Sequence, residues 1–552
     1  MDSSSHTERL RNRTLFFWNQ LNTSKQTSPQ TYDIHLDSVS GGIPAFVNYK
    51  VADIDFLPTT ILSEQSYTMD EAILLALNSL LQYAATANLG PTKSSRLFYL
   101  WFFTIATGFH WISPTTRITG TKDTWNWNTK YVLNQELDQF IWMNQLLIET
   151  MSSFVPGYDT SQLQQNEAKV VGLNTEDLAS KIQSIRSIAN WTAWKSAWDT
   201  WWSYRQTDGN IAAAAVPADS SLPNGSQTLE VTTTTDNPNT FTDPQKWTPL
   251  KINGSKKNYL TYGWNDVTST GLTSDQETTI KNICQTYFPG TASSWNDGSV
   301  RANEINDLVN LTNTLTDEQK IVAEFWAGGP FTVSPPGMMI WLWANYMRCE
   351  KIAHTKGYDV FFYSGFELAI HLFETGRLVW GLKKTNMEAR PIQDIRRMYR
   401  GQTLKKYDGT SILGEAWIPY QTSNFVTPPF PDFPSGHSAF SQSFANVMNK
   451  WFSQYIEKKA YTFQTLALLS PIFSEWQTNT FATFIIKKGT SEIQSTTVPS
   501  QDITLTWSSW QDLANSSGIS RQYGGIHCTS AHTGSQALAN QLYTTLQTVW
   551  GL

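Results

Sequence analysis

The stretch Pro428-Pro429-Phe430-Pro431-Asp432-Phe433-Pro434-Ser435-Gly436-His437-Ser438 stands immediately before a strong helical pattern. Its prolines and Gly436 keep the backbone out of a helix and predict a tight turn at the helix start. After this turn, apolar residues recur at helical spacing at Phe440, Phe444, Val447, Trp451 and Tyr455. Ser435, Gly436 and His437 should therefore lie at a helix N-terminus, where free backbone N–H groups and the helix dipole favour an anion. The alternative is a capping turn with a surface histidine.

Length and composition indicate a large globular protein. The chain has 552 residues and a formal net charge of −6, so we expect two or three packed units and no long nucleic-acid track. Its three cysteines, Cys284, Cys349 and Cys528, are far apart and odd in number. They predict neither a disulfide framework nor a C-x-x-C metal pair.

Neither a signal peptide nor a membrane span is expected from the sequence. Residues Met1 to Arg13 are polar and charged, without the apolar core of a signal peptide. The most apolar run, Leu97 to Ile112, is short for a membrane span and contains His110. We interpret it as a buried helix, and the sequence assigns no compartment.

Composition and periodicity divide the chain into four parts. Residues 1–65 form a polar N-terminal arm, residues 66–204 a helical bundle, residues 205–272 a long irregular excursion, and residues 273–552 a C-terminal helical bundle with the candidate site. Five tryptophans follow one helix face in the first bundle, at Trp191, Trp194, Trp198, Trp201 and Trp202. Their spacing predicts core packing rather than ligand stacking.

A second informative segment contains Lys383 and Arg390. Lys383 lies on the apolar side of a predicted helix that also carries Phe366, Phe373 and Trp380. Because Pro391 disfavours helical geometry at Arg390, we expect this helix to end there. Lys383 and Arg390 are then about two turns apart and project the same way. The alternative is that Lys383 extends to solvent and Arg390 caps the helix.

The third segment is Ser520-Arg521-Gln522-Tyr523-Gly524-Gly525-Ile526-His527, which precedes the last predicted helix. Arg521 and His527 therefore flank a second turn into a helix N-terminus. Two such turns with two arginines and a lysine would make a cationic pocket inside an acidic protein. Its natural guest is a tetrahedral oxyanion that accepts a fifth ligand.

Taken in order, the motifs Lys383-x6-Arg390-Pro391, Pro434-Ser435-Gly436-His437 and Ser520-Arg521-x5-His527 resemble a known three-part signature. It is the signature of the vanadium-dependent haloperoxidases and the related type 2 phosphatidic acid phosphatases. The resemblance covers roughly residues 65–552. It implies a mainly α-helical protein built on two four-helix bundles, with vanadate held in the second.

The resemblance also implies a role for each site residue. His527 would bond the vanadium, and the equatorial oxygens would be held by Lys383, Arg390, Arg521, the Ser435 hydroxyl and the Gly436 N–H. His437 would be the acid–base residue, and Lys383 would polarise the peroxide that halide attacks to give hypohalous acid. Trp380 and Phe430 would line the halide side. The implied partners are hydrogen peroxide, a halide and an organic acceptor, without nucleic acid or membrane, and a homo-oligomer is left open.

Two alternative functions stay open at the level of sequence. A phosphatase would use the same residues, with His527 attacking phosphorus and His437 protonating the leaving group. A catalytically silent relative is the second alternative, because the acidic residue usual four positions after the last histidine is Ala531 here. His532, Ser530 or a backbone carbonyl would then have to orient the His527 ring.

Overall fold

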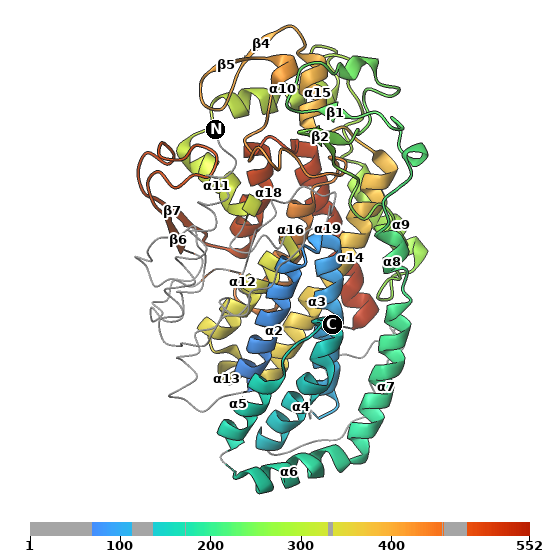
Figure 1. The fold of residues 1–552 in the computed structure, drawn as a ribbon, viewed down its shortest axis with the longest axis vertical. Coiled ribbons are helices and arrows are strands. Elements are labelled where there is room, and N and C mark those ends of the chain that lie inside the picture. The colour runs from blue at the N-terminus through green and yellow to red at the C-terminus, as the bar shows by residue number, and fades with distance from the viewer. Residues whose placement is uncertain are drawn as a thin grey trace.

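The computed structural model describes residues 69–112, 136–171, 173–328, 335–454, 456 and 483–551. The predicted polar arm, residues 1–65, lies outside this range. Long helices dominate the described residues (Figure 1), so the prediction of a mainly α-helical fold is confirmed.

The first third of the described chain is helical. Its helices are α2 (Met69–Thr86), α3 (Gly90–His110), α4 (Glu136–Phe154), α5 (Ser161–Val171), α6 (Thr175–Ser187) and α7 (Ala189–Gln206). The apolar run predicted as a buried helix forms most of α3, whose start has Pro91 in its first turn. Asn174 caps α6 by accepting hydrogen bonds from the backbone N–H groups of Glu176 and Asp177.

The middle section contains only short elements. They are α8 (Asn210–Ala213), η3 (Asp219–Ser221), β1 (Leu229–Glu230), η4 (Pro238–Thr240), β2 (Leu250–Ile252), β3 (Ser255–Lys256) and η5 (Trp264–Asp266). β2 pairs in parallel with β1 and antiparallel with β3. Leu250 and Leu229 are adjacent in this small sheet, and both are buried.

The remaining elements build the half of the molecule that holds the candidate site. The helices are α9 (Ser274–Gln285), α10 (Val300–Asn313), α11 (Asp317–Gly328), α12 (Pro335–Cys349), α13 (Ile352–Thr355), α14 (Tyr358–Asn386), α15 (Pro391–Met398), η6 (Gly414–Ala416), α16 (Gly436–Trp451), α18 (Trp510–Tyr523) and α19 (Thr529–Trp550). Two antiparallel hairpins pair β4 (Thr403–Lys405) with β5 (Ser411–Leu413) and β6 (Thr483–Ile486) with β7 (Ile503–Thr506).

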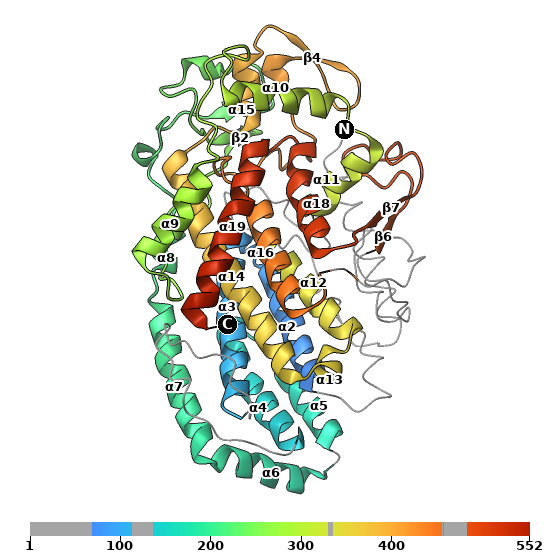
Figure 2. The same cartoon turned by 180° about the vertical axis from the view of Figure 1, so that it is seen from behind.

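Helix α14 is the centre of this half. It packs against α3, α16 and α19, and α16 packs in turn against α18 and α19. Figures 1 and 2 show α14, α16 and α19 running side by side, with α15 and α10 near one end of the molecule. One hydrophobic cluster joins residues of α2, α3, α4, α14, α16 and α19, so the core is continuous from the early helices to the last one.

No helix in the described part of the chain combines the length and apolar character that a membrane span requires.

Candidate functional site

The turn before α16 forms as its sequence predicts. Ser435 is the N-cap of α16, and its side chain accepts a hydrogen bond from the backbone N–H of Ser438. The Ser435 backbone N–H donates to the Ala531 carbonyl at 2.9 Å, which ties this turn to the start of α19. Gly436 opens the helix, and a Cβ added there would meet the Trp380 and Phe440 rings at 3.8 Å. The Gly436 backbone therefore lies directly against Trp380.

Lys383 is fully buried near the end of α14 and is held by the segment before this turn. Its Nζ donates to the carbonyl oxygens of Pro431 and Asp432 at 2.8 and 2.9 Å. Burial, followed by the Arg390 charge, lowers the pKa of the Lys383 ammonium well below its usual value. The alternative in which Lys383 extends to solvent is therefore wrong.

The predicted relation between Lys383 and Arg390 along one helix is also wrong. Helix α14 ends at Asn386, because Met387 turns into the left-handed region and Glu388 pairs with Lys246 of the middle section. Arg390 is instead the N-cap of α15, so it does not cap the end of α14. Although the two residues do not share a helix, both side chains donate to carbonyl oxygens of the same segment, residues 430–432.

The Arg390 guanidinium is buried, and two of its three nitrogens donate hydrogen bonds to backbone carbonyl oxygens. Its Nε donates to the Phe430 carbonyl at 2.7 Å, and its Nη1 donates to the Ile526 carbonyl at 2.8 Å. Its Nη2 is buried and has no hydrogen-bond partner within the described residues. Burial lowers the pKa of Arg390 to about 10, with the Asp432 carboxylate opposing the shift.

His527 lies between Arg390 and Asp432. Its Nδ1 bonds to Asp432 Oδ1, and its Nε2 lies 3.2 Å from Arg390 Nη1. Because an ionised carboxylate only accepts, Nδ1 carries the proton of the neutral ring and Nε2 keeps its lone pair. Burial and the Arg390 charge lower the pKa of His527 to about 3, against the attraction of Asp432. The ring is therefore neutral near neutral pH.

Asp432 is a functional candidate that the sequence analysis missed. The side chains expected to compensate for Ala531 form their hydrogen bonds elsewhere: Ser530 bonds to Glu304, and His532 bonds to the Ser438 hydroxyl. The carbonyl of Ala531 accepts from Ser435 instead. The signal that could have pointed to Asp432 was a lone carboxylate in an otherwise apolar, proline-rich segment, which is costly to bury without partners.

Arg301 on α10 lies among three buried acidic side chains, Asp432, Asp394 and Glu388. Burial raises the pKa of Glu388 well above its usual value, so Asp432 and Asp394 are the carboxylates that Arg301 pairs with. Its Nη1 lies 2.9 Å from Asp432 Oδ2 and 3.5 Å from Glu388 Oε1, and its Nε donates to Asp394 Oδ2 at 3.0 Å. Burial raises the pKa of Asp432, but His527, Arg301 and Arg390 outweigh this effect and hold the pKa below its usual range. Asp432 is therefore ionised and can accept from His527.

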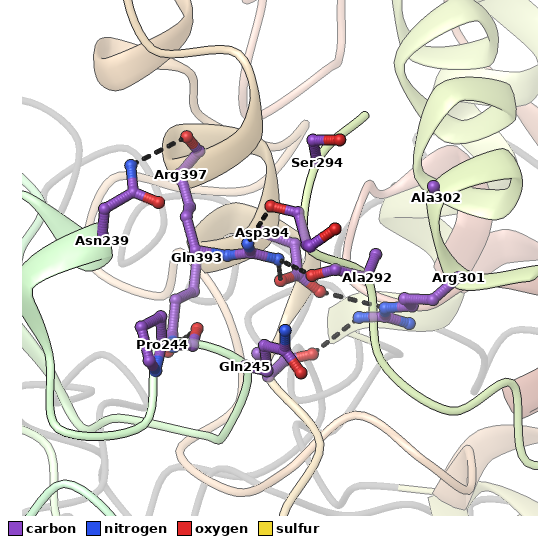
Figure 3. Close-up of polar contacts among 12 residues, drawn as sticks. Asn239, Pro244, Gln245, Ala292, Ser294, Arg301, Ala302, Gln393, Asp394 and Arg397 are labelled. Atoms are coloured by element: carbon purple, nitrogen blue, oxygen red, sulfur yellow. Dashed lines mark hydrogen bonds and ion pairs between the residues drawn. The ribbon is translucent and has the colours of Figure 1, made fainter. Parts of the chain in front are cut away.

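Figure 3 shows how α15 is anchored in the same region, with Asp394 between Arg301 and Arg397. Arg397 donates to Asp394 Oδ1 at 3.0 Å and to the Ala292 carbonyl at 2.6 Å. Gln393 donates to the carbonyls of Pro244 and Lys246 in the middle section. These bonds fix the helix that begins directly after Arg390.

Arg521 and His437 approach from the α11 side. Arg521, in the last turn of α18, donates from Nη2 to the Ala323 carbonyl and from Nε to the Ser520 hydroxyl. Burial lowers its pKa to about 9. His437 is half-buried, and its Nε2 lies 3.0 Å from the Trp326 carbonyl. Burial, then the Arg521 charge, lowers the pKa of His437 well below its usual value.

Aromatic rings form one wall beside Lys383. The Trp380 and Phe430 ring centroids are 4.9 Å apart, and Lys383 Nζ lies 6.0 Å from the first and 5.0 Å from the second. Trp380 is fixed by a hydrogen bond from Nε1 to the Leu260 carbonyl at 2.9 Å. Next to Leu260, the Tyr259 hydroxyl is buried without a hydrogen-bond partner in the described chain. Burial raises its pKa well above the usual value, and the Arg390 charge opposes this shift.

The arrangement fits an anion. The structure gathers the buried basic side chains of Lys383, Arg390 and Arg521 near the two histidines, His437 and His527, and Asp432 is the carboxylate that bonds to His527. The unused Arg390 Nη2 and Tyr259 hydroxyl are donors that an oxyanion could satisfy. Among the described residues, no group of three or more His, Cys, Asp or Glu side chains is arranged so that it could hold a metal ion.

Comparisons with known proteins show similarity in a family model and in overall fold. Residues 364–549 match the family described as VCPO second helical-bundle domain. A bacterial vanadium-dependent iodoperoxidase structure is similar with a TM-score of 0.56 at 16% identity, over 87% of this chain and 96% of that one. The apo and holo forms of a bacterial vanadium-dependent chloroperoxidase both give 0.53, at 13% and 14% identity, over 84% and 86% of this chain and 95% of theirs. No curated protein matches the chain by sequence.

Proposed function

We propose that this vanadium haloperoxidase-like protein binds vanadate and uses hydrogen peroxide to oxidise a halide to hypohalous acid. The observation that carries the proposal is the His527 ring, which has its Nδ1 proton committed to Asp432 and its Nε2 lone pair beside buried cations. A neutral imidazole nitrogen is a good metal ligand, and fixed cations stabilise the negative oxygens around the metal.

The residues present fit vanadate. His527 Nε2 would be the ligand to the metal, and the oxygens would be held by Lys383, Arg390, Arg521, the Ser435 hydroxyl and the Gly436 N–H. Vanadate, when bound, supplies a Lewis acid that activates peroxide without changing its own oxidation state. Lys383 has two donors bound to carbonyl oxygens, so its third N–H can reach an oxygen of the anion.

His437 would move the proton that the reaction requires. In the neutral ring, the bond to the Trp326 carbonyl places the proton on Nε2 and leaves Nδ1 as the acceptor. Its lowered pKa keeps this ring neutral, so Nδ1 can accept a proton from hydrogen peroxide, and the same shift makes the ring a weaker base than an ordinary histidine. Overall, hydrogen peroxide, a halide ion and one proton give hypohalous acid and water.

The aromatic wall supports halide as the substrate. Trp380 and Phe430 lie against Lys383, and both rings are buried. Apolar ring surfaces exclude water but offer few hydrogen bonds, which suits a weakly hydrated halide better than a phosphate ester. The hypohalous acid would then react with an organic acceptor.

Phosphate-ester hydrolysis would use the same cations and the same two histidines, and the aromatic wall argues against it. A catalytically silent relative was suggested by Ala531 alone, and the bond from His527 to Asp432 removes that reason. Both alternatives give distinct outcomes in one experiment.

The test uses purified protein freed of bound oxyanion. Vanadate, hydrogen peroxide and, in turn, iodide, bromide and chloride are added, and halogenation of a reporter is followed. We expect vanadate-dependent halogenation in the wild type and at least a 100-fold loss in His527→Ala. A parallel assay without vanadate contains a generic phosphate ester. Ester hydrolysis that vanadate inhibits would favour the phosphatase, and no activity in either assay with folded protein would reject both enzymes.

A further inference from the structure

The His527 ring is held by a carboxylate from outside its own helix. His527 immediately precedes Cys528, the N-cap of α19, whereas Asp432 belongs to the segment before α16, 95 residues earlier. Only 3% of the His527 side chain and none of the Asp432 side chain is exposed. A hydrogen bond between two buried polar groups fixes the ring more strongly than a contact at the surface would.

Arg301 fixes the carboxylate in turn. It uses Nη1 on Asp432 Oδ2, Nε on Asp394 and Nη2 on the Ala389 carbonyl, which engages all three guanidinium nitrogens. The Asp432 backbone N–H also donates to the Glu388 carbonyl at 3.1 Å. One carboxylate oxygen therefore faces Arg301, and the other faces His527.

In the family that this chain resembles, the residue at the position of Ala531 is an acid that orients the histidine. Ala531 has a different role here. Ala531 is fully buried in the hydrophobic core, and its carbonyl accepts the Ser435 backbone N–H. A methyl group cannot orient an imidazole. The two turns of the site are therefore linked twice, once through Ala531 and Ser435 and once through His527 and Asp432.

We propose that Asp432, anchored by Arg301, is the positioning residue for His527 and replaces the acidic side chain that Ala531 lacks. It holds the proton on Nδ1, so that Nε2 presents its lone pair toward Arg390. This inference deepens the proposed function. The expected effect of Asp432 on vanadate binding rests on that function, whereas the positioning of the His527 ring does not.

The first measurement concerns the wild type without oxyanion. The full-length protein is labelled with ¹⁵N-histidine, and the His527 resonances among the eight histidines are identified by their absence in His527→Gln. We expect the nitrogen shifts of a neutral ring with its proton on Nδ1. A ring protonated on Nε2 would overturn the proposal, and this spectrum decides the matter even if the variants below do not fold.

The second measurement compares Asp432→Asn with Asp394→Asn. Each variant removes one carboxylate from Arg301, but only Asp432 contacts His527. In Asp432→Asn, Arg301 should bind the amide oxygen, so the amide NH₂ faces Nδ1 and the ring proton moves to Nε2. We expect the affinity for orthovanadate, measured by calorimetry, to fall about 10- to 100-fold. Asp394→Asn should keep the wild-type tautomer and an affinity near that of the wild type.

The two measurements separate this inference from the proposed function. An Asp432→Asn protein that keeps both the Nδ1–H tautomer and the wild-type affinity would overturn the role of Asp432, as would equal losses in both variants. A wild type that shows the Nδ1–H tautomer but binds no vanadate would uphold the positioning role and reject the proposed function.

Discussion

The His437 ring uses one of its two nitrogens, Nε2, on the Trp326 carbonyl. Burial and the nearby Arg521 charge lower its pKa well below the usual value. The folded state therefore resists protonation, whereas the unfolded chain takes up a proton at about pH 6.5. Because the unfolded state binds more protons below that pH, the contribution of His437 to stability decreases as the pH falls.

This difference predicts the effect of His437→Asn. Between pH 7 and pH 5.5, the wild type should lose roughly 1 kcal/mol more free energy of unfolding than the variant, because only the wild type has this histidine to protonate on unfolding. Urea titrations at both pH values measure the difference. The matched control is His354→Asn, since 44% of the His354 side chain is exposed. An identical pH dependence in the wild type and His437→Asn would contradict the neutral state of this ring in the folded protein.

At this scale the sequence identifies most candidate residues but not their partners. Helix starts and turns are local features of the sequence, so the motifs alone identify most candidate residues. These are Lys383, Arg390, Ser435, His437, Arg521 and His527. Asp432 and Arg301 are different, since they meet His527 only through the fold and no local pattern marks them. Similarly, the proton position on His527 follows from a contact between residues 95 positions apart.

The segment of residues 428–436 organises the site at the scale of elements. Its carbonyl oxygens accept from Lys383 and Arg390, its Asp432 carboxylate binds His527, and its end caps α16. A proline-rich segment provides this many free carbonyls because it does not use them in a helix or sheet. It brings together Lys383 of α14, Arg390 before α15 and His527 before α19.

The error in relating Lys383 to Arg390 has a physical origin. Pro391 correctly indicated a helix boundary, but it marks the start of α15 rather than the end of α14. The actual end at Asn386 depends on Met387 adopting a left-handed conformation and on the pairing of Glu388 with Lys246, 142 positions earlier. A contact at that distance leaves no periodic signal near residue 386.

The clamp made by Arg301 between α10, α15 and this segment predicts a large stability effect. Arg301→Gln removes the charge that faces the buried carboxylates of Asp432 and Asp394. The free energy of unfolding should fall by about 3–5 kcal/mol, because buried carboxylates are left uncompensated.

The control for Arg301 is Arg186→Gln, which breaks a pair with Glu149 at 3.3 Å whose side chains are 38% and 35% exposed. An exposed pair of this kind contributes less than about 1 kcal/mol. Urea unfolding of both variants gives the comparison. An equally small decrease in the free energy of unfolding in both variants would show that Arg301 does not stabilise the Asp432 and Asp394 carboxylates.

The whole molecule shows why fold and site differ in predictability. Helical periodicity is repeated along the chain, so the mainly α-helical class follows from the sequence. The site, in contrast, combines residues from positions 259 to 527, and its geometry depends on how α10, α14, α16 and α18 pack. The division of the chain into residues 66–204, 205–272 and 273–552 stays a prediction.

The most direct test of the central claim is a calorimetric titration of orthovanadate into the anion-free protein at constant pH. We expect one site per chain in the wild type and a rise in the unfolding temperature with vanadate concentration, equivalent to about 2.7 kcal/mol at one hundred times the dissociation constant. His527→Ala, which removes the only proposed ligand to the metal, should abolish both effects. Binding of equal affinity in the wild type and in His527→Ala, or no binding in the wild type, would contradict the account.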